Sequence, residues 1–236
     1  MKRLIKTMAW PLTCLLMATL LFTACKKNNT DYVRQPAAGL MAFNLAVDKP
    51  AVGFTLSGNN LSGAVLNYTN YTGVYLPVYL GDREVRSFDY NTGGTIATTT
   101  ASFADSNYYS AFLLGAKGSY RNVIVNDNLK ALSANSGKAW VRYINAIPDS
   151  SIATTVIIGE SGINGVAPFA TVSAFAQVTA GPVATTVSNG STIAASRTIT
   201  LEENKVYTIL FVGLPNQTDS SEAVQVKYIV NGMVTP

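Results

Sequence analysis

Carboxylates are the residues of this chain that could carry out acid–base chemistry, because the sequence contains no histidine. The absence of histidine excludes Ser-His-Asp and Cys-His catalysis and metal sites of the imidazole type. A pair of carboxylates can hydrolyse a glycosidic bond without histidine, and Asp82 and Glu84 alternate so that they could share one face of a strand. The other candidates are Asp89, Asp105, Glu202 and Glu203. Solvated surface charge explains all of them more simply, so we predict no catalytic residue, no cofactor, no metal ion and no enzymatic activity.

The start of the chain has the order of a secretory signal peptide. Lys2, Arg3 and Lys6 provide positive charge, and an apolar stretch follows from Met8 to Phe22. That stretch is short for a membrane span and is interrupted by a proline. We therefore expect residues 1–24 to be a signal peptide that is removed after export.

Cys25 stands at the end of this signal. The sequence Phe22-Thr23-Ala24-Cys25 resembles the lipobox of bacterial lipoproteins, in which the thiol of the cysteine receives a diacylglyceryl group. The resemblance implies that Cys25 is lipidated, with fatty acids such as palmitate, and that the acyl chains hold the protein on a lipid bilayer. The alternative is ordinary secretion with a free cysteine.

The charge of the mature chain is close to balanced. Removal of residues 1–24 takes away three basic residues and leaves 14 basic against 13 acidic ones. No basic patch for nucleic acid then remains to be explained, so we expect no nucleic-acid partner.

Short apolar runs separated by turn residues make up most of the chain after the signal. Residues 25–37 are polar, and we interpret them as the lipidated cysteine followed by a flexible tether. From Gly39 onward, runs rich in Val, Ile, Tyr, Phe and Thr are bounded by Gly, Asn, Asp and Pro, which is typical of strands. We predict an all-β chain with two sandwich domains, at residues 38–131 and 138–236.

The two halves of the mature chain resemble each other at a spacing of about 100 residues. Tyr109 and Tyr207 each open a run that is apolar on both faces, so we expect buried central strands whose tyrosine hydroxyls bond to backbone. The aligned segments are Ala42-Phe43-Asn44 with Tyr143-Ile144-Asn145, Tyr75 and Gly81 with Phe175 and Gly181, Tyr109–Gly115 with Tyr207–Gly213, and Val123–Asn126 with Tyr228–Asn231.

The second half resembles family 4397 of the domains of unknown function, which is found in bacterial secreted and surface proteins. The matching segments are Val141–Asp149, Phe175–Gly181 and Thr200–Gly213. Asn204 stands where the family usually has Gly, and both residues tolerate a left-handed turn. The first half is a more divergent copy. The resemblance implies an immunoglobulin-like sandwich for each half, and it carries over no functional residues because the family has no agreed activity.

Tyrosine is the feature that most suggests ligand binding. Tyr68 and Tyr71 lie in the polar stretch Asn67–Thr72, and exposed tyrosines of this kind suit stacking on sugar rings or docking to a protein. The alternative is that they cover a thin sandwich core. Tyr68 and Tyr71 are the candidate ligand-binding residues, with a glycan or an envelope protein as the expected partner.

These features together predict a lipid-anchored, non-enzymatic cell-envelope protein that serves binding, adhesion or scaffolding. The alternative is a carbohydrate-active enzyme of the envelope, or a glycan-capture protein of an outer-membrane uptake system. Lys26 follows Cys25, where Asp would favour retention at the inner membrane. The outer membrane is therefore the expected location, with its periplasmic and surface faces both left open.

Overall fold

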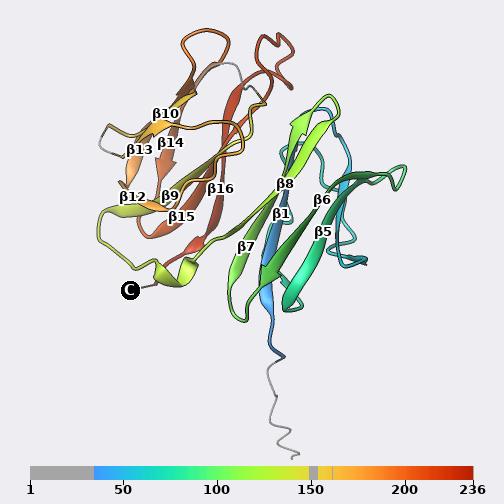
Figure 1. The fold of residues 1–236 in the computed structure, drawn as a ribbon. Coiled ribbons are helices and arrows are strands. Elements are labelled where there is room, and N and C mark those ends of the chain that lie inside the picture. Colours follow the sequence, from blue (N-terminus) through green and yellow to red (C-terminus); the bar gives the residue numbers. More distant parts are fainter. Residues whose placement is uncertain (1–34, 149–153, 161, 236) are drawn as a thin grey trace, which may run out of the picture. The chain divides into compact units, whose positions relative to one another are not determined.

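Eight strands form the first of two β-sandwiches in the computed structural model, which describes residues 35–148, 154–160 and 162–235. One sheet has the strand order β4-β1-β7-β8 and the other has the order β3-β2-β5-β6. Figure 1 labels β1, β7 and β8 of the one and β5 and β6 of the other. The strands are β1 (Ala38–Ala46), β2 (Val52–Leu56), β3 (Asn59–Asn60), β4 (Leu76–Val78), β5 (Gly81–Asp89), β6 (Thr95–Phe103), β7 (Tyr108–Ala116) and β8 (Ser119–Asn126).

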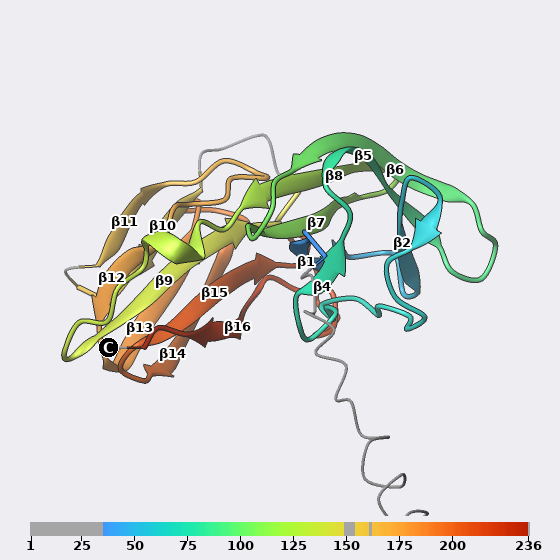
Figure 2. The same ribbon diagram turned by 90° about the horizontal axis from the view of Figure 1, so that it is seen from below.

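The second sandwich repeats this arrangement strand for strand, with sheets of order β12-β9-β15-β16 and β11-β10-β13-β14 (Figure 2). A short 3-10 helix, η1 (Leu129–Ala131), lies in the connection before it. The strands are β9 (Lys138–Asn145), β10 (Thr155–Ile158), β11 (Ile163–Val166), β12 (Ala176–Thr179), β13 (Gly181–Ser188), β14 (Ala194–Leu201), β15 (Lys205–Val212) and β16 (Gln225–Met233). The prediction of an all-β chain with two tandem immunoglobulin-like sandwiches is confirmed.

The described strands all belong to the unit Pro36–Pro236, which is separate from Met1–Gln35. The predicted signal peptide, the lipidation residue Cys25 and nearly all of the predicted tether lie outside the described residues. Within the part that the structure describes, there is no helix of the length and apolarity that a membrane crossing requires.

The central strands of each sandwich are buried on both faces. β1 pairs in parallel with β7, and β9 pairs in parallel with β15. Parallel strands covered on both sides need near-continuous apolar runs. Phe112 and Leu113 on β7 show why, since these neighbours point to opposite faces and both are fully buried, Leu113 inside the first sandwich and Phe112 outside it.

The predicted role of the two strand-opening tyrosines is confirmed. The backbone N–H of Ala104 donates to the hydroxyl oxygen of Tyr109 at 3.1 Å. The backbone N–H of Glu202 donates to the hydroxyl oxygen of Tyr207 at 2.9 Å, again from five residues earlier. Both hydroxyls therefore fix the turn that leads into their own strand. Asn204 lies in this turn of the second sandwich and has a left-handed φ of 61°, as its substitution for Gly led us to expect.

The repeated asparagines also have one role in both halves. The side-chain amide of Asn44 donates to the carbonyl of Leu66 at 3.0 Å and its oxygen accepts from the N–H of Ala46 at 3.1 Å. Asn145 does the same with Ala167 at 2.7 Å and Ile147 at 3.0 Å. Each asparagine ties the end of its central strand to a crossing loop, which explains why this residue type recurs in the repeat.

Candidate functional site

The outer faces of the central strands of the two sandwiches are buried in one shared cluster. The aromatic ring centroids of Phe43 and Phe112 lie 4.7 Å apart, and side chains of the second sandwich complete the packing around them. We call this set the inter-sandwich cluster, and its buried members are Met41, Phe43, Leu45, Phe112, Leu114, Ile144, Ala146, Leu210, Val212 and Ile229. The two sandwiches are thus joined by apolar burial as well as by the connecting chain.

An ion pair lies at one end of this interface. Nη1 of Arg142, on β9, is 2.5 Å from Oδ1 of Asp127, which directly follows β8, and the exposed fractions of the two side chains are 2% and 0%. Two charges that have lost their water are tolerated only when each is paired and hydrogen-bonded. The surrounding side chains must therefore supply the remaining hydrogen bonds.

Two hydroxyl groups of the first sandwich complete the contacts of Asp127. Its Oδ2 accepts hydrogen bonds from Oγ of Ser110 at 2.8 Å and from the hydroxyl of Tyr75 at 2.5 Å. Its backbone N–H donates to the carbonyl of Tyr108 at 2.8 Å. The carboxylate is therefore held as a charged acceptor by three side chains, since Arg142 donates to its other oxygen.

Hydroxyl groups from both sandwiches hold Arg142. Its Nε donates to Oγ1 of Thr208 at 2.9 Å and its Nη2 donates to Oγ of Ser110 at 2.8 Å. Thr208 donates in turn to Oδ1 of Asn231 at 2.6 Å, and the amide of Asn231 donates to the hydroxyl of Tyr75 at 3.2 Å. These bonds close a ring that we call the polar network, which comprises Tyr75, Ser110, Asp127, Arg142, Thr208 and Asn231.

Aromatic rings shield the ion pair from water. Cζ of Arg142 is 4.6 Å from the ring centroid of Phe175 and 5.8 Å from that of Phe112, which are cation–π distances. Burial, followed by the negative charge of Asp127, raises the pKa of the Tyr75 hydroxyl above its ordinary value. Tyr75 therefore remains a neutral hydrogen-bond donor to the carboxylate at physiological pH.

The polar network is built from equivalent positions of the two repeats. Tyr109 pairs with Asn126 on β8, and the equivalent Tyr207 pairs with Val230 on β16. Asn126 therefore corresponds to Val230. The alignment of Asn126 with Asn231 that the sequence suggests is therefore displaced by one residue.

The corrected register makes Asp127 and Asn231 equivalent. Ser110 donates to Asp127 as its equivalent Thr208 donates to Asn231. The two halves thus contribute matching hydroxyl–acceptor pairs. Arg142 is the departure from this symmetry, because Met41 stands at its position in the first half.

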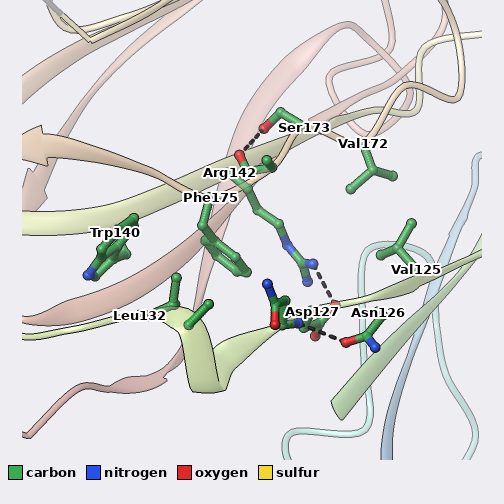
Figure 3. Close-up of a pocket in the computed structure, with 12 residues that line it drawn as sticks. Val125, Asn126, Asp127, Leu132, Trp140, Arg142, Val172, Ser173 and Phe175 are labelled. Carbon is green, nitrogen blue, oxygen red and sulfur yellow. Dashed lines mark hydrogen bonds and ion pairs between the residues drawn. The ribbon is translucent and has the colours of Figure 1, made fainter. Parts of the chain in front are cut away.

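A pocket of about 400 Å³ opens beside Arg142 (Figure 3). Trp140 and Phe175 of the second sandwich contribute aromatic surface, and Leu132 of the connection contributes an aliphatic side chain. Asn126 and Asn128, at the end of the first sandwich, are polar residues that also line it. The pocket therefore combines aromatic walls with polar groups, which is the usual composition of a small-molecule site.

The predicted binding residues Tyr68 and Tyr71 lie elsewhere, half-buried against the inter-sandwich cluster. The ring of Tyr71 stacks on that of Phe43 with centroids 5.3 Å apart, and burial raises the pKa of the Tyr68 hydroxyl. These positions favour the alternative in which the tyrosines cover a core. Ligand contact by Tyr68 and Tyr71 stays a prediction.

The candidate carboxylates serve turns and surfaces where the structure describes them. Asp82 and Glu84 are exposed on β5. Asp89 accepts hydrogen bonds from the backbone of Asn91 and Thr92. Among the described residues, no three His, Cys, Asp or Glu side chains are grouped to hold a metal ion.

The sequence reasoning missed the residues that meet at the pocket. Asp127 lies in the triplet Asn126-Asp127-Asn128, whose residue types are typical of a turn, and the N–H of Asn128 donates to Oδ1 of Asn126 at 2.9 Å. The available signal was Arg142, a charged residue in the middle of the apolar run Lys138–Asn145. A charge in a buried strand requires a partner, and Asp127 is the acidic residue nearest to it on the N-terminal side of the chain.

Comparison with known proteins identifies a family. The family described as "Domain of unknown function (DUF4397)" matches residues 38–151 and 139–227. No curated protein sequence matches the chain. A carbohydrate-binding module of family 26 from Eubacterium rectale, solved with maltoheptaose, has a TM-score of 0.25 at 10% identity, covering 83% of this chain and 97% of that one. A protein described as a cell adhesion candidate from Bacteroides ovatus has a TM-score of 0.23 at 7% identity, covering 86% and 99%.

Proposed function

The chain belongs to this family of domains of unknown function, and from that premise we propose that it is a lipid-anchored, non-enzymatic binding protein of the cell envelope. In this proposal the acyl chains on Cys25 hold the protein on the outer membrane. The tether of residues 25–37 carries the two sandwiches, which serve binding, adhesion or scaffolding.

The main support for a binding role is that the charged groups at the pocket are paired with each other. Among the pocket residues that the structure describes, the charged side chains are Arg142 and Asp127, and they are committed to each other at 2.5 Å. General acid–base catalysis needs a group that is free to exchange a proton with the substrate. A pocket whose charges are already paired is suited to holding a ligand rather than transforming it.

The shared apolar burial supports the scaffolding part of the proposal. Side chains from both sandwiches form the inter-sandwich cluster, and the polar network crosses the same interface. Such contacts hold two domains in one arrangement and so fix the spacing of any surfaces that they present.

Fractionation of cells tests the anchor. We expect the wild-type protein in the membrane fraction and labelled by an alkyne analogue of palmitate, whereas Cys25→Ala should lose the label and appear in the soluble fraction. Cys14→Ala is the matched control, because Cys14 lies within the predicted signal peptide and its replacement should change neither result. Membrane-bound and labelled Cys25→Ala protein would contradict the proposal, and protease treatment of intact cells would assign the face.

A further inference from the structure

We propose that the pocket beside Arg142 binds a neutral sugar residue of a glycan, with Trp140 and Phe175 as the aromatic surfaces on which the sugar ring lies. This inference rests on the proposed binding function and names the ligand class of that site. It places glycan binding at the junction of the two sandwiches and away from Tyr68 and Tyr71.

The charge of the pocket selects a neutral ligand. Arg142 and Asp127 are each nearly or completely buried and neutralise one another. An acidic or a basic ligand therefore meets no net charge here that would compensate for the water it loses on binding. Displacing either partner of the buried pair would in addition leave an uncompensated charge, so the site favours a neutral ligand.

Unused donors select a ligand with several oxygens. A guanidinium has five N–H groups, and the hydrogen bonds of Arg142 with other described residues engage one donor on each nitrogen. Two N–H groups therefore have no acceptor within the part of the chain that is described. The side-chain NH₂ of Asn126 likewise donates to no other described residue, while its oxygen accepts from Asn128. Sugar hydroxyl oxygens are suitable acceptors for such groups.

The aromatic walls are held in place before a ligand arrives. Nε1 of Trp140 donates to the carbonyl of Ser133 at 2.8 Å, which ties the indole to the connecting chain. Phe175 lies over the guanidinium of Arg142 at 4.6 Å, and both rings are half-buried. Fixed aromatic faces stack on the C–H face of a sugar at little entropic cost. An acyl chain would instead leave the polar donors of this pocket without partners.

The first sandwich has the same fold but other residues at the positions that form this pocket. Leu40 pairs with Tyr109 in the first sandwich, and Val141 pairs with the equivalent Tyr207 in the second. Gly39 is therefore equivalent to Trp140, and Met41 is equivalent to Arg142. The space beside Gly39 is filled by the ring of Tyr108, 2.7 Å from where a Cβ would lie. The sandwich therefore folds without a tryptophan and an arginine at these positions, which favours a role for them beyond packing.

Tryptophan fluorescence offers a direct test, because the chain has two tryptophans, Trp10 and Trp140. Trp10 lies in the predicted signal peptide, and Trp10→Phe ensures that all tryptophan emission comes from Trp140 at the pocket even in protein that keeps this segment. The probes are cellobiose, maltotriose, chitobiose, mannobiose and xylobiose, with digalacturonate as a charged sugar and tetraproline as a peptide. We expect saturable quenching by at least one neutral sugar, confirmed by saturation-transfer NMR, and none by digalacturonate or tetraproline.

Variants separate this site from the alternatives. Phe175→Ala and Asn126→Ala should each weaken sugar binding at least tenfold, whereas Tyr68→Ala and Tyr71→Ala, which remove the rings at the other candidate site, should leave it unchanged. Circular dichroism of each variant checks that the sandwich remains folded. No saturable quenching by any of the neutral sugars, binding of tetraproline instead, or full affinity in Phe175→Ala would overturn the inference. A protein that fails this test but stays membrane-bound and labelled would still satisfy the anchoring proposal.

Discussion

Arg142 and Asp127 belong to different sandwiches, yet they share a 2.5 Å contact from which water is excluded. Only 15 positions separate them in the chain, because one follows the last strand of the first sandwich and the other lies on the first strand of the second. The connection between the domains is therefore spanned by an ion pair as well as by backbone.

Removal of either charge is expected to be strongly destabilising. Arg142→Met or Asp127→Asn alone leaves its partner as an uncompensated buried charge, which costs about 3–5 kcal/mol. The double variant should recover most of this loss, because methionine and asparagine are the residues that the other repeat has at the equivalent positions, Met41 and Asn231. Urea unfolding of the four proteins measures the coupling. Additive losses in the double variant would show that the pair is not coupled.

The inter-sandwich cluster should make a large contribution to stability. Phe112→Ala removes a fully buried ring that packs on Phe43, and such truncations cost about 3–5 kcal/mol. Tyr79→Ala is the control, because this side chain is 77% exposed and its loss should change the unfolding free energy by less than about 0.5 kcal/mol. Calorimetry of both variants provides the comparison, and equal melting temperatures would contradict the burial of Phe112 between the sandwiches.

Gly115 should not tolerate any side chain. Its φ is 120°, and a Cβ there would lie 2.0 Å from the carbonyl oxygen of Ser119, so we expect Gly115→Ala to cost more than about 3 kcal/mol or to prevent folding. Gly118→Ala separates the effect of the positive φ from the effect of the close contact, because Gly118 has a φ of 87° but open space around it. That control should lose only about 1 kcal/mol. Similar losses in denaturant unfolding would mean that the close contact is unimportant.

Tyr75 should make stability fall at alkaline pH. The folded state raises the pKa of its hydroxyl above the ordinary value of 10.0, first through burial and then through Asp127. The stabilisation of the neutral hydroxyl is thus fully present below pH 10 and is lost as the pH rises through the folded-state pKa. Tyr75→Phe should lower stability at neutral pH by about 1–3 kcal/mol and should flatten part of the decline above pH 10. Unfolding curves at several pH values, with Tyr79→Phe as the control, measure both effects; an unchanged slope in Tyr75→Phe would contradict the assignment.

The strand pattern and the repeat could be predicted because they depend on local signals. The alternation of apolar and turn residues marks the strands, and Tyr109 and Tyr207 mark the central ones through the same five-residue contact. The pocket could not be predicted in this way. Its walls come from the end of one sandwich and the start of the other, and the sequence alignment that sets Asn126 against Asn231 is displaced by one residue from the strand pairing. That displacement hid the equivalence of Asp127 and Asn231.

The matching faces in the inter-sandwich cluster have a consequence for how such a chain could arise. Phe43 and Ile144, like Phe112 and Leu210, are equivalent positions that meet in one cluster, as in the isologous interface of a two-fold symmetric homodimer. A single-sandwich ancestor with this face would gain from self-association. Gene duplication and fusion would turn that encounter into an intramolecular one, which no longer weakens on dilution.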